Sequence, residues 1–83
     1  MDNEMIKVLK VLESNKNKWL SQYGIGKELG VHHFNLTLPL RKLRELFLSK
    51  NKPHGLEIRH GFEDPDSKVE LHERAEYYYR ISE

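Results

Sequence analysis

The chain has 83 residues, a third of them charged, with a formal net charge of +1; this length supports one domain with a modest core and argues against an enzyme. It contains no cysteine, which excludes disulfides, thiolate metal sites and cysteine catalysis and agrees with a cytoplasmic location. No apolar run approaches the roughly 20 residues of a membrane span, and the first residues do not resemble a signal peptide, so we expect a soluble protein.

The first predicted helix lies near the start of the chain. Its apolar residues recur at the three- and four-residue spacing that gives a helix one apolar face. They are Met5, Val8, Leu9 and Leu12. Residues 18–20, Lys-Trp-Leu, are then expected to form a short strand.

A second, short helix is predicted over residues 22–29. Ser21 is its expected N-cap, because the hydroxyl can accept a hydrogen bond from an unpaired amide of the first turn. Gly30 is expected to turn the chain in the left-handed conformation, and Gly26 to allow the close approach of another helix. The expected apolar side consists of Tyr23, Ile25 and Leu29, with Val31 filling the corner.

The third predicted helix covers residues 35–48. At about 100° per residue, one narrow apolar stripe contains Leu36, Leu40, Leu43 and Phe47. Asn35 is the expected N-cap and Thr37 the alternative; Pro39 fits either choice, because first-turn amides have no partner within the helix. The outward face is expected to carry Thr37, Leu38, Arg41, Lys42 and Glu45.

Two segments that alternate with a period of two are predicted to pair as a β-hairpin. They are residues 56–60, Leu-Glu-Ile-Arg-His, and residues 76–82, Glu-Tyr-Tyr-Tyr-Arg-Ile-Ser. In the second segment Tyr77 and Tyr79 share one face and Tyr78 lies on the other. We expect two of the three tyrosines in the core, near Trp19 and Ile58.

The segment between these strands is acidic. Residues 63–73 hold five acidic side chains and a single lysine, so we expect this tip to avoid a phosphate backbone. Periodicity leaves open whether residues 67–75 extend the hairpin or form a helical turn. The charge of the chain is lopsided, because residues 1–54 carry ten Lys or Arg against five Asp or Glu, or +5, and residues 55–83 carry four against eight, or −4.

The five histidines do not predict a metal site. His32 and His33 are adjacent and therefore cannot share a helical face at the usual four-residue ligand spacing, and His54, His60 and His72 have no recognised spacing. A phosphate loop is not predicted either, because Gly24-Ile-Gly-Lys27 lacks the following Ser or Thr. We expect no cofactor and no small-molecule substrate.

From Ser21 to Leu46 the chain resembles the helix-turn-helix of winged-helix DNA-binding domains. Members of that family have a first helix, a short strand, the two helices of the motif and a β-hairpin wing, and all of these parts can be placed here. The resemblance implies an α+β winged helix in which residues 1–83 form one domain. The helix-turn-helix would occupy about 21–48, the wing about 55–82 and the acidic tip 63–73.

The resemblance implies sequence-specific binding of double-stranded DNA by a small transcriptional regulator, with residues 35–48 in the major groove. Arg41 is the leading candidate for guanine recognition, because a guanidinium can donate two hydrogen bonds to that base edge. The expected base-facing residues are Thr37, Leu38, Arg41 and Lys42. The expected phosphate-binding residues are Ser21, Gln22, Lys27, His32, His33, Arg44, Lys50 and Lys52.

The partners follow from the same resemblance. One helix contacts only a few base pairs, so a homodimer or a protein partner is expected to add specificity, with the first helix and the last strand as alternative dimer surfaces. The alternative function is a winged-helix module for protein interaction, which would use the acidic wing and an exposed Leu38. Binding to a membrane is not expected.

Overall fold

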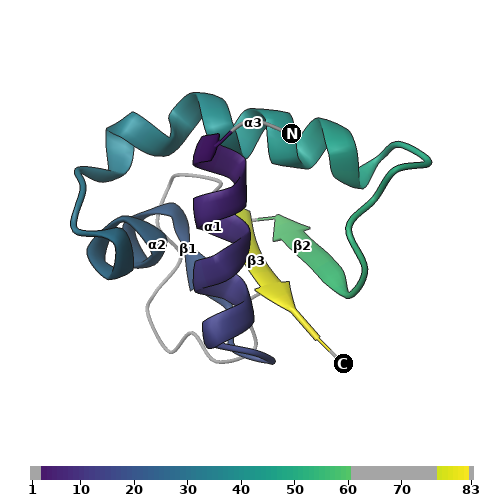
Figure 1. Ribbon diagram of the computed structural model, residues 1–83, viewed down its shortest axis with the longest axis horizontal. Helices are drawn as coiled ribbons and strands as arrows, with labels where there is room; N and C mark the ends of the chain where they lie inside the picture. Colours follow the sequence, from purple (N-terminus) through teal and green to yellow (C-terminus); the bar gives the residue numbers. More distant parts are fainter. Residues whose placement is uncertain (1–2, 61–76, 83) are drawn as a thin grey trace.

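Three α-helices and a three-stranded antiparallel sheet make up residues 3–60 and 77–82, the part of the chain that the computed structural model describes (Figure 1). In chain order the elements are α1 (Asn3–Ser14), β1 (Leu20–Ser21), α2 (Gln22–Leu29), the short 3-10 helix η1 (His33–Leu36), α3 (Thr37–Phe47), β2 (Leu56–His60) and β3 (Tyr77–Ile81). The α+β class is therefore confirmed. The acidic tip predicted at 63–73 lies outside the described residues.

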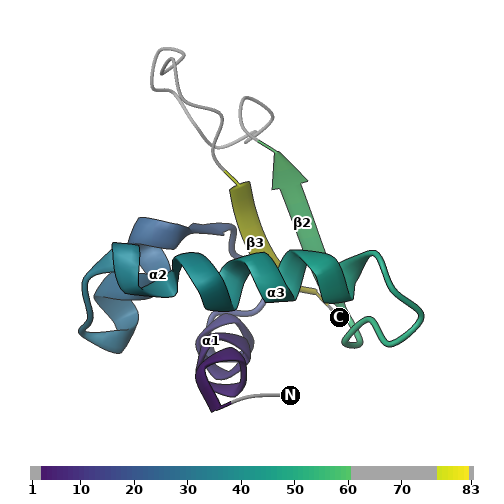
Figure 2. The ribbon, with the colours of Figure 1, turned by 90° about the horizontal axis from the view of Figure 1, so that it is seen from above.

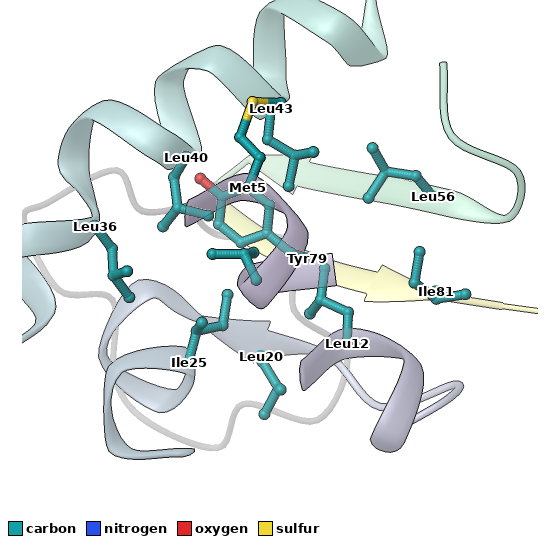
Figure 3. Packing of buried hydrophobic residues seen from close by; sticks show 11 residues of the cluster. Met5, Leu12, Leu20, Ile25, Leu36, Leu40, Leu43, Leu56, Tyr79 and Ile81 are labelled. Carbon is teal, nitrogen blue, oxygen red and sulfur yellow. The ribbon is translucent and has the colours of Figure 1, made fainter. Parts of the chain in front are cut away.

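The core lies between the helices and one face of the sheet. Figure 3 shows the Tyr79 ring among the aliphatic side chains of this cluster. The buried side chains come from every α-helix and every strand: Met5, Val8, Leu12, Leu20, Ile25, Leu36, Leu40, Leu43, Leu56, Tyr79 and Ile81. The apolar faces predicted for the first and third helices are confirmed, because burial follows their three- and four-residue spacing.

The strand order is β1-β3-β2, so the last strand lies in the middle of the sheet. Tyr79 pairs with Leu20 on one side and with Ile58 on the other. The first strand begins two residues later than predicted, because Leu20 and Ser21 are the residues that pair with β3. In Figure 2, β2 and β3 extend side by side away from the helices.

The prediction that two of the β3 tyrosines are core residues is wrong. Tyr79 is 1% exposed, Tyr78 is half-buried on the opposite face of the strand, and Tyr77 is 37% exposed. Tyr77 shares the inward face of Tyr79, but its ring meets the side chains of Arg44 and His60 in place of the aliphatic core. A strand's period of two determines the face of a side chain but not how far the helices cover it.

Both predicted ends of α2 are confirmed. The Ser21 hydroxyl oxygen accepts a hydrogen bond from the Gly24 amide at 3.1 Å, and Gly30 is left-handed with φ of 71°. A Cβ atom on Gly26 would lie 3.0 Å from the Val31 carbonyl oxygen, so the close approach is made by the turn and not by a second helix. The expected burial of Tyr23 and Val31 is wrong, because both side chains are exposed where this turn leaves the core.

The start of α3 differs from the prediction. Asn35 belongs to η1, where its amide donates to the His32 carbonyl oxygen, and it does not cap α3. α3 begins at Thr37, and the preceding Leu36 makes no capping hydrogen bond through its side chain. A side-chain cap is found instead at the start of η1, where Nδ1 of His32 accepts from the Phe34 amide at 3.2 Å. Pro39 lies in the first turn of α3, as predicted.

Candidate nucleic-acid interface

The outward face predicted for the third helix is present on α3. Leu40 and Leu43 are buried, whereas the opposite side exposes Thr37, Leu38, Arg41, Lys42 and Glu45. Figure 2 shows α3 lying across the near side of the molecule, with the other helices behind it. An exposed, amphipathic helix in this position can be laid against a large partner without disturbing the core.

Arg41 and Lys42 lie at the two edges of this face. Arg41 lines a groove of about 450 Å³ between α3 and the hairpin, together with Arg44, Glu45, Phe47, Leu48, Ile58, His60 and Tyr77. Lys42 lines a second groove, of about 570 Å³, beside Met5 of α1. Adjacent residues diverge by about 100° around a helix, so the two cations can contact different parts of one partner.

Gln22 connects the start of α2 to the start of α3. Its Nε2 atom donates to the His33 carbonyl oxygen at 2.6 Å and to the Thr37 hydroxyl oxygen at 3.2 Å. This predicted phosphate ligand therefore holds the turn against α3. Ser21 accepts a hydrogen bond at its hydroxyl oxygen and Thr37 does the same, and each hydroxyl has one hydrogen that it can donate.

The turn before α3 carries a cluster of rings that the sequence interpretation treated only as two candidate phosphate ligands. The rings of His32 and His33 are stacked, with centroids 4.6 Å apart, and Phe34 lies 4.9 Å and 4.5 Å from them. Tyr23 meets His33 edge to face at 5.5 Å. Because Nδ1 of His32 accepts from the Phe34 amide, the proton of the neutral ring is assigned to Nε2, which can donate outward.

Arg44, another predicted phosphate ligand, connects α3 to β3. Its Nη1 atom donates to the Tyr79 hydroxyl oxygen at 2.7 Å, and its guanidinium lies 4.4 Å from the centroid of the Tyr77 ring. The hydrogen bond gives the phenol of Tyr79 a polar partner, and the ring contact adds a cation–π attraction. Arg44 therefore positions the hairpin relative to α3, a role that the sequence interpretation missed.

The remaining predicted phosphate ligands lie beyond the two ends of α3. The Lys27 ammonium of α2 is 5.7 Å from the Tyr23 ring, on the side where α3 begins. Lys50 and Lys52 follow the end of α3, and the Lys52 ammonium lies 4.6 Å from the Phe47 ring. Figure 1 shows α2 near the start of α3 and the loop that follows α3 at its other end. Lys52 therefore lies beside Phe47, which lines the same groove as Arg41, whereas Lys27 lies beside Tyr23, which meets His33 in the turn before α3.

The outer face of the sheet holds Trp19 between cations. The guanidinium groups of Arg80 and Arg59 lie 4.4 Å and 5.4 Å from its ring, and Arg80 forms an ion pair with Glu57 on the neighbouring strand. The hydrogen bond from Arg80 lowers the pKa of the Glu57 carboxyl below its usual value of 4.5, against a smaller opposing effect of desolvation.

Folding stability should therefore fall in acid partly through Glu57. A lowered pKa in the folded state stabilises the fold above pH 4.5, and this contribution is lost as the pH falls through the folded-state pKa. Glu57→Gln should make the free energy of unfolding, measured by urea denaturation, fall less steeply between about pH 6 and pH 3. The difference should be clearest at low salt, because the ion pair is partly exposed. Parallel pH profiles for the two proteins would contradict this assignment.

The described residues offer no gathering of three or more His, Asp or Glu side chains that could hold a metal ion. None of the helices in residues 3–60 and 77–82 has the length and apolar character needed to cross a membrane. Comparison of the chain with protein-family models, with curated proteins and with solved structures finds no match.

Proposed function

We propose that the chain is a winged-helix domain that binds double-stranded DNA in a sequence-specific manner, as a small transcriptional regulator. The order of elements supports this proposal, because two helices joined by a tight turn are followed by two strands that pair as a hairpin. The strand before α2 pairs with the last strand, so the sheet supports both helices of the motif. Residues 1–83 would form this one domain.

The observation that carries the proposal is the exposed outer face of α3. Arg41 and Lys42 are exposed, and α3 is fixed at its first turn by Gln22 and near its last turn by Arg44. A helix fixed at both ends holds the backbone of a base-reading residue in place, so that only its side chain has to be ordered on binding. In this arrangement Arg41 donates to the acceptor atoms of guanine in the major groove.

The cations beyond the ends of α3 would supply the contacts that do not depend on sequence. Lys27 on one side and Lys50 and Lys52 on the other would meet phosphates along a duplex that α3 enters; all three side chains are exposed, and the last two follow the end of α3. The Nε2 hydrogen of His32 would add a polar contact at the turn. One helix covers few base pairs, so a second copy of the chain or a partner protein would provide the rest of the specificity.

The decisive experiment is a titration of labelled random duplex at several salt concentrations. We expect binding that weakens steeply with salt, and loss of this salt-dependent binding when Arg41→Glu and Lys42→Glu are combined, since two acidic side chains then face the negatively charged duplex. The matched control combines Lys7→Glu with Lys10→Glu, which makes the same charge change on α1, outside the proposed interface. If the two double variants change the affinity for duplex and its salt dependence equally, the proposal is wrong.

Single alanine variants should separate base contacts from phosphate contacts. Arg41→Ala is expected to cost about 1 to 3 kcal/mol on the preferred duplex and to relax the preference at one position. Lys50→Ala should weaken binding to all duplexes alike. Competition between selected and scrambled duplexes measures both effects. Uniform losses in both variants would contradict this division of roles.

The second candidate function is a module for protein interaction. It is favoured by exposed apolar side chains on and beside α3, above all Leu48, which is 84% exposed. An amphipathic helix can dock such side chains in the groove of a partner. If the unmodified protein binds duplex weakly and its affinity hardly changes with salt concentration, this candidate is favoured.

A further inference from the structure

Exposed apolar side chains lie at the start of α3, and the proposed contacts of cations with bases and phosphates give them no role. Phe34 is 67% exposed, the highest value among the Phe, Tyr and Trp side chains of the described residues. Leu38, four residues later, is 55% exposed. Phe34 lies in η1 and Leu38 in the first turn of α3, so both side chains are at the start of α3, ahead of Arg41 and Lys42 along the chain. We call Phe34 and Leu38 the apolar row.

Phe34 is held in a defined position. Its amide donates to Nδ1 of His32, and its carbonyl oxygen accepts from the Thr37 amide. Its ring contacts both histidine rings, and Gln22 joins the His33 carbonyl to Thr37. An exposed aromatic side chain on such a braced turn can make contacts at a small cost in conformational entropy.

The charges around this row indicate its occupant. Lys27 lies beside the Tyr23 ring on one side, and Arg41 and Lys42 follow Leu38 on the other. A protein interface also surrounds an apolar core with a polar rim, but cations at both ends of the row match the two chains of phosphates that border the major groove, between which lie the apolar methyl groups of thymine. A short apolar row with cations at both ends therefore complements the major groove better than a protein surface.

We propose that Phe34 and Leu38 contact the C5-methyl groups of thymines, so that this end of α3 selects sites containing thymine. The inference rests on the proposed function and adds the base that is recognised. Leu38 and Arg41 are three residues apart, about 4.5 Å along a helix, and neighbouring bases on one strand are about 3.4 Å apart. The thymine contacted by Leu38 therefore lies one or two base pairs from the guanine contacted by Arg41.

Replacement of thymine by uracil tests this proposal, because uracil lacks only the methyl group. A preferred duplex is first selected from a random library with the unmodified protein. Uracil is then introduced at each thymine in turn, and affinity is measured at fixed salt. We expect about a fourfold loss at each contacted position, the factor that corresponds to exposing one buried methyl group. Positions outside the contact should show no loss.

The variants identify the side chains responsible. In the double variant Phe34→Ala and Leu38→Ala, the affinities for the thymine and uracil duplexes should become equal. Leu48→Ala is the matched control, because it removes an exposed leucine beyond the other end of α3 and should keep the fourfold ratio. Thermal unfolding checks that each variant is folded, which the exposure of these side chains leads us to expect.

The outcomes distinguish the inference from the function on which it rests. Steep salt dependence with equal affinity for thymine and uracil duplexes overturns the inference and leaves DNA binding in place. A methyl effect that persists in the double variant also overturns it, because other side chains would then be responsible. Absence of salt-dependent duplex binding overturns both.

Discussion

Leu43→Ala should destabilise the fold by about 2 to 5 kcal/mol, the range for truncating a buried leucine. Leu43 is completely buried on the inner side of α3. A domain of this length has a free energy of unfolding of roughly 4 to 12 kcal/mol, so the variant would lose a large part of its stability. Urea unfolding followed by tryptophan fluorescence measures the loss, with Trp19 as the only tryptophan of the chain.

Leu38→Ala is the control on the same helix. The same atoms are removed from an exposed side chain, so the change in stability should stay within about 0.5 kcal/mol. In DNA binding the order should be reversed: Leu38→Ala should weaken affinity for duplex directly, because Leu38 would contact the duplex, whereas Leu43 supports the fold. Equal losses of stability would show that the two faces of α3 are misassigned.

Gly55→Ala is the second change with a large expected effect, about 3 kcal/mol of lost stability. Gly55 has φ of 78°, a left-handed conformation that an alanine adopts only at a cost. The added Cβ atom would also overlap the carbonyl oxygen of Ser82. The backbones already meet there, because the Ser82 amide donates to the Gly55 carbonyl oxygen at 2.8 Å.

Gly24→Ala provides the matched control for this substitution. Gly24 lies in α2, and an added Cβ atom would make an ordinary contact of 3.5 Å with the Leu20 side chain. Since alanine favours the helix by about 1 kcal/mol over glycine, this variant should be as stable as the unmodified protein or more stable. Denaturation midpoints that move in the same direction would contradict the structural roles assigned to the two glycines.

The loss of stability in Gly55→Ala should also weaken DNA binding at the proposed interface on α3. Gly55 lies where β2 begins and β3 ends, and β3 carries both tyrosines that hold Arg44. If the variant folds with a weakened hairpin, Arg44 loses a fixed partner and the end of α3 becomes less ordered. Binding to all duplexes should then weaken in parallel with stability, without a change in the preferred sequence.

The candidate site was predicted in part. The exposure of Leu38, Arg41 and Lys42 followed from helical periodicity, because burial of one stripe determines which side chains lie opposite to it. The different surroundings of Arg41 and Lys42 did not follow, because the hairpin and α1 lie on different sides of α3. Their role in binding DNA stays a prediction.

The sequence by itself determined the features that depend on neighbours along the chain. The Ser21 cap and the left-handed Gly30 each need only the residues of one turn, and the α+β class follows from the two periodicities. The 3-10 turn before α3 was not predicted. In this turn the Thr37 amide, from which a cap at Asn35 could have accepted a hydrogen bond, donates to the Phe34 carbonyl oxygen.

Only the tertiary structure decided the roles of side chains whose partners are distant in sequence. Arg44 and Tyr79 are 35 positions apart, and Gln22 reaches Thr37 across 15. Gly55 meets Ser82 only because β2 and β3 pair, which brings the start of one strand beside the end of the other. Local sequence patterns specify which residues form helices and strands and which faces are apolar, whereas these contacts arise from the packing of the elements against one another, which short-range patterns do not encode.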